Sequence, residues 1–112
     1  MARRGTSAGA GVLRERVTIQ RKVVSRDGYG AEQVTWQDVA TVWARVEVVK
    51  GREVPESRQM DVMSSHRVTM RYRTDVDETM RLMWRGRVLH IVALIPDERR
   101  RYLAVLAEEH VM

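Results

Sequence analysis

The stretch VWARVEVVKGREVPESRQMDVMSSHRVTMRYR, residues 42–73, decides the fold. Apolar and polar residues alternate in it twice, at 42–49 and at 64–73, and a period of two is typical of β-strands with one buried face. The charged segment KGREVPESRQM, residues 50–60, separates the two runs. A hairpin turn needs only about two to five residues. The sequence therefore predicts two strands joined by an insertion that is too long for a simple turn.

Each of the two runs has an apolar and a polar face. The apolar face of the first run holds Val42, Ala44, Val46 and Val48. The matching face of the second run holds His66, Val68, Met70 and Tyr72. The opposite face of the second run is basic and polar and holds Arg67, Thr69, Arg71 and Arg73.

A further alternating run, RVTIQRKVV at residues 16–24, predicts the first strand. Arg21 interrupts its apolar row, and a charge in that position favours an edge strand, where it discourages unwanted pairing. Asp27-Gly28 and Tyr29-Gly30 in the following segment are turn signals, because glycine accepts a positive φ. We expect the next strand to be interrupted at Gln37-Asp38 and to run again to residue 49.

The C-terminal half predicts shorter strands at close spacing. A carboxylate-rich turn at 74–80 is followed by a short strand ending at Trp84, a turn at Arg85-Gly86, a strand at 87–95 and a turn at Pro96-Asp97. The segment 101–108 contains helix formers, but its alternation after a turn at hairpin spacing favours a strand. Five to six strands predict a mainly β fold, a small antiparallel β-barrel or sandwich. The insertion could hold a short helix starting at Pro55-Glu56.

Composition limits the organisation of the chain. Its 112 residues predict a single domain over 12–112, preceded by a flexible Gly/Ala-rich arm at 1–11. There is no cysteine, which excludes disulfides and thiolate zinc sites. No segment approaches the roughly 18 apolar residues of a membrane span, so we expect no membrane partner. The N-terminus lacks the apolar region of a secretory signal, which favours the cytoplasm or an assembly made there.

The pattern of titratable residues indicates no catalytic site and no metal site. The three histidines, at 66, 90 and 110, lack the close spacing of metal ligands. Asp75, Asp77 and Glu78 lack the spacing of a calcium loop and are typical of a solvated turn. Neither a Gly-rich phosphate loop nor a nucleophile motif is present. The sequence therefore predicts that the protein is not an enzyme.

Basic residues are the remaining signal. The net charge is +5, and all but two of the 20 Lys and Arg residues are arginine. Arg67, Arg71 and Arg73 share one face of the run at 64–73, and a basic strip of this kind can follow phosphates without reading sequence. The plainer alternative is a solvated outer face of a sheet, balanced by nearby carboxylates.

The order and spacing of several segments resemble a known family. LRERVTIQRKVVSRDGYGAEQVTWQDVATVWARVEVVKGRE at 13–53 is followed by HRVTMRYR at 66–73, MRLMWRGRVLHI at 80–91 and PDERRRYLAVLAEE at 96–109. Together they resemble the phage head closure, or head–tail adaptor, family of long-tailed phages and gene transfer agents. The Gly/Ala-rich arm before Val12 departs from that pattern.

The resemblance implies a small β-barrel-like domain with a structural role and no cofactor. Copies would form a ring, with a portal-adaptor protein above and a tail terminator or other tail protein below. The ring would close the DNA-filled head, let packaged DNA pass without sequence specificity, and give the tail a docking surface. The protein would then belong to a virion or phage-like particle assembled in the bacterial host cytoplasm.

For such a ring, the charged insertion is the expected contact region, facing either the DNA channel or a neighbouring subunit. Its candidate residues are Lys50, Gly51, Arg52, Glu53, Glu56 and Arg58, and the candidate phosphate-facing residues are Arg67, Arg71 and Arg73. Two alternatives stay open. One is a small OB-like nucleic-acid-binding module, and the other is a tail-side completion protein of similar fold.

Overall fold

The computed structural model describes residues 13–52 and 62–111, and six β-strands account for most of them. The strands are β1 (Glu15–Arg26), β2 (Glu32–Arg52), β3 (Val62–Arg71), β4 (Arg81–Trp84), β5 (Arg87–Pro96) and β6 (Tyr102–Val111). The described part of the chain contains no helix. The last segment is a strand, as its alternation predicts.

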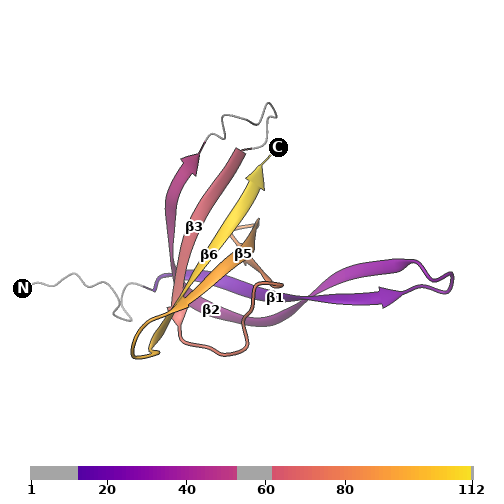
Figure 1. The fold of residues 1–112 in the computed structure, drawn as a ribbon, viewed down its shortest axis with the longest axis horizontal. Coiled ribbons are helices and arrows are strands. Elements are labelled where there is room, and N and C mark those ends of the chain that lie inside the picture. The colour runs from indigo at the N-terminus through magenta and orange to yellow at the C-terminus, as the bar shows by residue number, and fades with distance from the viewer. Residues whose placement is uncertain (1–12, 53–61, 112) are drawn as a thin grey trace, which may run out of the picture.

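The strands form one closed antiparallel barrel in the order β1-β2-β3-β6-β5-β4 (Figure 1). The predicted mainly β fold is confirmed. Because the ring of hydrogen bonds between strands is closed, the fold is a barrel and not a sandwich. Inward-facing residues of every strand fill the interior, which suits a barrel of this size. The buried core holds Val17, Ile19, Ala44, Val68, Met70, Val76, Leu82, Trp84, Leu89, Ile91, Leu103, Val105 and Ala107.

The barrel closes through a short seam between β1 and β4. Residues 18–20 of β1 pair with residues 81–83 of β4. Beside this seam, a carboxylate oxygen of Glu15 accepts a hydrogen bond from the indole of Trp84 at 2.9 Å, and Arg85 donates two bonds of 3.0 Å to the same carboxylate. The Trp84 bond and the Arg85 guanidinium hold the pKa of Glu15 below its ordinary value. These contacts add side-chain bonds where the backbone ladder is shortest.

One expectation about the first two strands is wrong, and another holds for only part of a strand. β2 is not interrupted at Gln37-Asp38, because both residues pair with β1, opposite Arg21 and Gln20. Instead, Val39 is an extra residue that forms a bulge, which bends a strand while it continues to pair. β1 is also not an edge strand over residues 18–20, since it has partners on both sides there.

Beyond the barrel, β1 and β2 continue as a two-stranded arm, defined here as residues 21–37 (Figure 1). In this arm, β1 pairs with β2 up to Arg26 and Glu32. The described residues give its β1 strand no second partner. The charge at Arg21, which suggested an edge, therefore marks the point where the hairpin leaves the barrel.

The strand β2 also runs further than expected at its other end. Lys50, Gly51 and Arg52 pair with residues 63–65 of β3, after a second bulge at Val49. The predicted insertion therefore begins as a regular part of the sheet. Its remaining residues, the short helix considered for them, and the N-terminal arm lie outside the described residues.

One buried polar group in the core lacks a partner. His66 is fully enclosed, and neither ring nitrogen has a hydrogen-bond partner among the described residues. Its ring meets the edge of Trp84 at a centroid distance of 5.8 Å. An unsatisfied buried polar group costs roughly 1–3 kcal/mol.

We predict that His66→Leu stabilises the barrel by about 1 kcal/mol, because an apolar side chain replaces the unsatisfied nitrogens. For a domain of this size, that corresponds to a rise of roughly 4 °C in the unfolding midpoint. Thermal unfolding followed by circular dichroism measures it. A lower midpoint would show that the imidazole makes interactions the apolar residue cannot replace.

A second prediction concerns the ion pair between Arg87 and Glu109. Arg87 donates two bonds of 2.9 and 2.6 Å to the nearly buried Glu109 carboxylate and holds its pKa below the ordinary value of 4.5. A carboxyl group whose pKa is lower in the folded than in the unfolded state stabilises the fold at pH values above its unfolded-state pKa. This stabilisation is lost as the pH falls through the folded-state pKa. Glu109→Gln should therefore lower the unfolding midpoint at pH 7, and its difference from the parent should shrink below about pH 4.

The matched control for this prediction is Glu98→Gln, in the exposed turn between β5 and β6. It should leave the midpoint almost unchanged at both pH values, as most surface substitutions do. A Glu109→Gln difference that stays constant with pH would contradict the account.

Candidate interaction surfaces

A groove lies at the end of the barrel where the described chain begins. It consists of two adjoining hollows of about 400 and 280 Å³ that share Leu13, Trp43 and Arg71. The other residues that line it are Arg14, Val42, Tyr72 and Arg73. This set is called the groove below. Because it joins residues from three distant parts of the chain, it exists only in the folded barrel.

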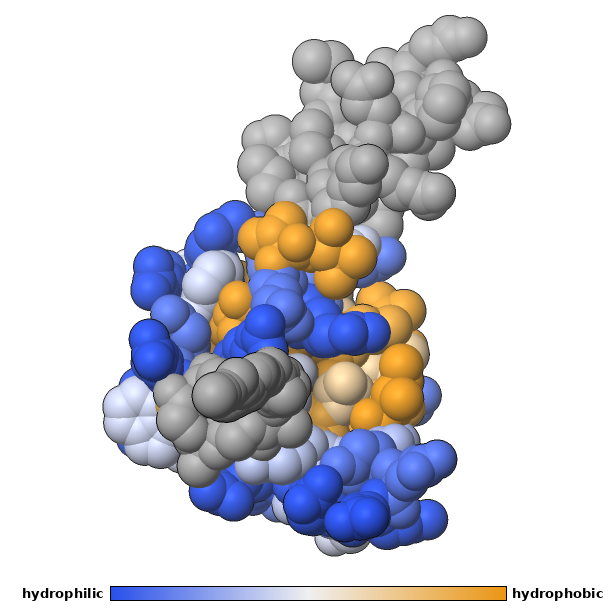
Figure 2. Space-filling model, turned by 90° about the vertical axis from the view of Figure 1, so that its left-hand side faces the viewer, coloured by the Kyte–Doolittle hydropathy of each residue, from blue (hydrophilic) through white to orange (hydrophobic). Residues whose placement is uncertain are grey.

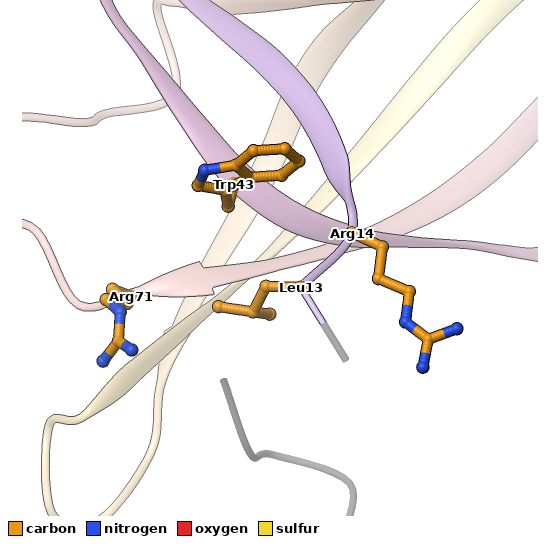
Figure 3. Close-up of a pocket in the computed structure, with 4 residues that line it drawn as sticks. All are labelled: Leu13, Arg14, Trp43 and Arg71. Atoms are coloured by element: carbon orange, nitrogen blue, oxygen red, sulfur yellow. The ribbon is translucent and has the colours of Figure 1, made fainter. Parts of the chain in front are cut away.

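Strand register places the central residues of the groove. Trp43 lies opposite Arg16 of β1, and Ala44 lies opposite Met70 of β3, so Trp43 and Arg71 are neighbours on the outer face. The guanidinium of Arg16 covers the Trp43 ring at 4.6 Å, which is a cation–π distance. Figure 3 shows Leu13 below Trp43, with Arg71 on one side of it and Arg14 on the other, extending away.

The arginines around the groove differ in their partners. Arg73 donates two bonds of 2.9 and 2.8 Å to Asp75, and this pair lowers the pKa of Asp75 and raises that of Arg73. Arg71 is exposed and makes no ion pair or hydrogen bond with another described side chain. The positive charge of Arg71 is therefore available to a ligand that enters the groove.

The arm is held to the barrel by a chain of polar contacts at its base. Arg81 of β4 stacks over the Trp36 ring at 4.2 Å and donates a 2.8 Å bond to Gln20. The amide of Gln20 donates a bond of the same length to Asp38. These contacts join the arm to the seam that closes the barrel, and they fix the direction in which it projects.

The tip of the arm is a turn held by hydrogen bonds to Asp27. Asp27 accepts bonds from the backbone N–H groups of Tyr29 and Ala31 at 2.8 and 3.0 Å. Gly30 has φ +85°, a conformation that glycine adopts without strain. Within this turn the Tyr29 side chain is 98% exposed. The tip thus presents a fully solvated aromatic side chain on an ordered loop.

The structure describes only some of the contact residues predicted from the sequence. Lys50, Gly51 and Arg52 lie in β2, while Glu53, Glu56 and Arg58 lie outside the described residues. Arg67 and Arg71 lie on the outer face of β3. Arg73 lies beyond the end of β3 and forms an ion pair with Asp75. Of the three arginines predicted to share one strand face, only Arg67 and Arg71 do so.

Sequence reasoning missed the groove and the arm tip. The one available signal was the alternation at 42–49, which put Trp43 on the same face as Arg45 and Glu47. A tryptophan on a charged outer face is unusual for a packing anchor, and this one is 53% exposed. On the side of the molecule opposite the arm, hydrophobic and hydrophilic surface lie side by side (Figure 2).

Neither a metal site nor a spanning helix is found in the part of the chain that the structure describes. No three His, Asp or Glu side chains there are grouped so as to hold a metal ion. No helix within the described ranges is long and apolar enough to cross a membrane.

Comparison with known proteins decides the family. A family model described as phage head completion protein matches residues 9–110, which include all but the last residue of the barrel strands. The chain belongs to the phage head completion protein family. No curated protein matches it significantly.

Solved structures give the same fold for this head completion protein. A chain from a structure described as the virion of a native gene transfer agent particle matches with a TM-score of 0.73 at 23% identity, covering 88% of this chain and 96% of that one. Protein SF1141 from Shigella flexneri 2a matches with a TM-score of 0.69 at 34% identity, covering 89% and 95%.

The resemblance to the head closure family is therefore confirmed. The family is a structural one and not a known enzyme family. Membership makes the chain a structural head completion protein of a phage, with a role at the head–tail junction. It implies contacts with other head and tail proteins.

We predict that Arg81→Ala loosens the arm without unfolding the barrel. The substitution removes one cation–π contact and one hydrogen bond, together worth about 1–2 kcal/mol. Amide hydrogen exchange in the arm should therefore become about 10-fold faster, while β3 and β6 keep their protection. Arg99→Ala, in the exposed β5–β6 turn, is the control. Equal exchange in both variants would show that these contacts do not hold the arm.

Proposed function

We propose that copies of this chain form a ring at the neck of a phage or gene transfer agent particle. The ring closes the DNA-filled head below the portal-adaptor protein and gives the tail its docking surface. The observation that carries this proposal is the head completion family match over residues 9–110. The likeness to a chain of a gene transfer agent virion supports the same setting through the fold.

The shape of the subunit suits a ring. A ring contact is heterologous, so every copy must offer two different surfaces to its neighbours. The arm and the groove are two such surfaces, and they come from different parts of the barrel. The closed barrel has no free sheet edge in its ring of strands, whereas the β1 strand of the arm keeps an edge beyond Gln20 that no described strand pairs with.

Packaged DNA is the second proposed partner, without sequence specificity. Arg67 and Arg71 lie exposed on the outer face of β3 and can contact phosphates, which carry no sequence information. Arg73 contributes less, because Asp75 neutralises it. With few unpaired arginines on this face, the surface is better suited to let DNA slide past than to hold it tightly. This favours the neck role rather than an OB-like DNA-binding module.

The segment after β2 is the proposed contact of each copy with the channel or a neighbouring subunit. Its first residues, Lys50, Gly51 and Arg52, are anchored by pairing with β3. Its charged residues Glu53, Glu56 and Arg58 follow directly on this anchored stem. A charged segment that starts from a fixed strand end is suited to reaching a neighbour.

We predict that replacing residues 53–60 with a short Gly/Ser turn leaves the barrel folded but prevents head closure or tail joining. The pairing of residues 50–52 with β3 is kept, so the unfolding midpoint should change little. Particles carrying the variant should leak DNA or remain tail-less in electron micrographs, and their infectious or transfer titre should fall at least 100-fold.

The control for this experiment is a Gly/Ser replacement of the same length as residues 53–60, which separates loss of charge from loss of length. Normal particles from the short-turn variant would contradict the proposed role of this segment. Detection of the protein in purified tails, and its absence from tail-less heads, would assign it to the tail side instead.

A further inference from the structure

We propose that the tip of the β1–β2 arm docks into the groove of a second copy of this chain, with Tyr29 as the anchor. This inference rests on the proposed function, because a ring requires two different complementary surfaces on each subunit. It adds the partner of each surface and the residues that meet.

The tip has the properties of a docking element. Tyr29 is almost fully exposed, although its side chain could bury a large apolar area. The turn around it is fixed by Asp27, which accepts two backbone N–H bonds, and by the bond from Gly30 N to the Asp27 carbonyl at 3.1 Å. Arg26 also donates a 3.1 Å bond to the carbonyl of Gly30. A rigid tip loses little conformational entropy on binding.

The shaft of the arm carries two exposed valines close to its tip. Val24 and Val34 face each other across the strands, and each is about half exposed. Tyrosine is enriched among residues that dominate binding, and such anchors lie at the centre of an apolar contact. The two valines and Tyr29 are large exposed hydrophobic residues of the arm that no described part of the same chain covers.

The groove is complementary to this tip. Leu13, Val42 and Trp43 give it apolar walls, and its larger hollow measures about 400 Å³. That volume is within the usual range for a site that takes up an organic ligand. Half of the Trp43 surface remains exposed even with Arg16 on its face. An aromatic side chain placed beside Trp43 would bury that surface.

The charges of the groove and the tip are also complementary. Arg71 stands at the groove without a partner among the described residues, whereas Arg73 has Asp75. Asp27 at the tip accepts hydrogen bonds from two neutral backbone N–H groups, which do not neutralise the negative charge of its carboxylate. With Tyr29 in the groove, Asp27 of one copy can pair with Arg71 of the next copy, which leaves Arg67 as the exposed arginine of β3 that can contact DNA phosphates.

The tip cannot reach the groove of its own copy. Val17 pairs with Val42 at the groove, and the strand then continues along the arm to Arg26. At about 3.3 Å per residue, the tip lies roughly 30 Å away. Because the base of the arm is fixed by Arg81 and Trp36, it does not fold back. The contact must therefore join two copies head to tail, a contact that repeats into a ring if the rotation closes.

Engineered cysteines test the contact without interference, because the chain has no cysteine of its own. Purified Tyr29→Cys chain is mixed at millimolar concentration with Arg71→Cys chain and oxidised mildly. The matched control replaces Arg71→Cys with Arg67→Cys, which lies on the same outer face of the same strand but outside the groove. A disulfide requires Cα atoms within about 7 Å, so it reports a specific approach.

The proposal predicts a disulfide-linked heterodimer with Arg71→Cys in at least 10-fold greater yield than with Arg67→Cys. Equal yields at the two positions, or no heterodimer with either, would overturn it. A Tyr29–Arg71 link that forms only after residues 1–11 are deleted would also overturn it, because it would assign the groove to the chain's own N-terminal residues.

Self-association gives a second measurement. Tyr29→Ala should weaken association about 30-fold in sedimentation equilibrium, the loss expected for a dominant anchor. Gln33→Ala, an exposed substitution on the arm shaft, should leave it within about 2-fold. Equal association of the two variants would contradict the role of Tyr29.

These results separate this inference from the proposed function. If the cysteine link fails while particles lacking the protein still lose DNA or tails, the neck function stands and the arm–groove contact is wrong. If the link forms but particles lacking the protein join heads and tails normally, the contact is right and the proposed function is wrong.

Discussion

The short seam between β1 and β4 is the constraint on which the rest of the structure depends. Residues 18–20 and 81–83 complete the hydrogen-bonded ring, and without them the sheet would be open. The bonds from Trp84 and Arg85 to Glu15 strengthen the seam from one side. The contacts of Arg81 with Gln20 and Trp36 extend it from the other. Closure therefore fixes the interior, the start of the arm and the end of the barrel that carries the groove.

The alternation of residues predicted the strands well, because a half-buried strand must place apolar residues at every second position. His66, Val68 and Met70 face inward as their spacing indicates. The prediction failed at Gln37-Asp38, where a bulge at Val39 lets polar residues stay paired within a continuous strand. A bulge changes the register without a specific residue signal, so this sequence did not reveal it.

The interaction surfaces were harder to predict than the fold. The groove joins Leu13, Trp43 and Arg71, which no local pattern connects and which strand register alone brings together. Arg73 seemed equivalent to its neighbours in the sequence, but β3 ends before it and Asp75 neutralises it. The family resemblance, by contrast, depended on the order of several short segments along the whole chain, and the match over residues 9–110 confirms it.

Fold and family together describe a structural subunit of a phage head. In the proposed ring, the barrel is the body of each subunit, the arm projects toward the next copy, and the groove receives the arm of the previous copy. The most direct measurement is a structure of the particle neck by electron cryomicroscopy. The account predicts a ring of these barrels below the portal-adaptor protein, with the Tyr29 tip of each copy beside Trp43 of the next. Barrels located elsewhere in the particle, or present as isolated single copies, would contradict it.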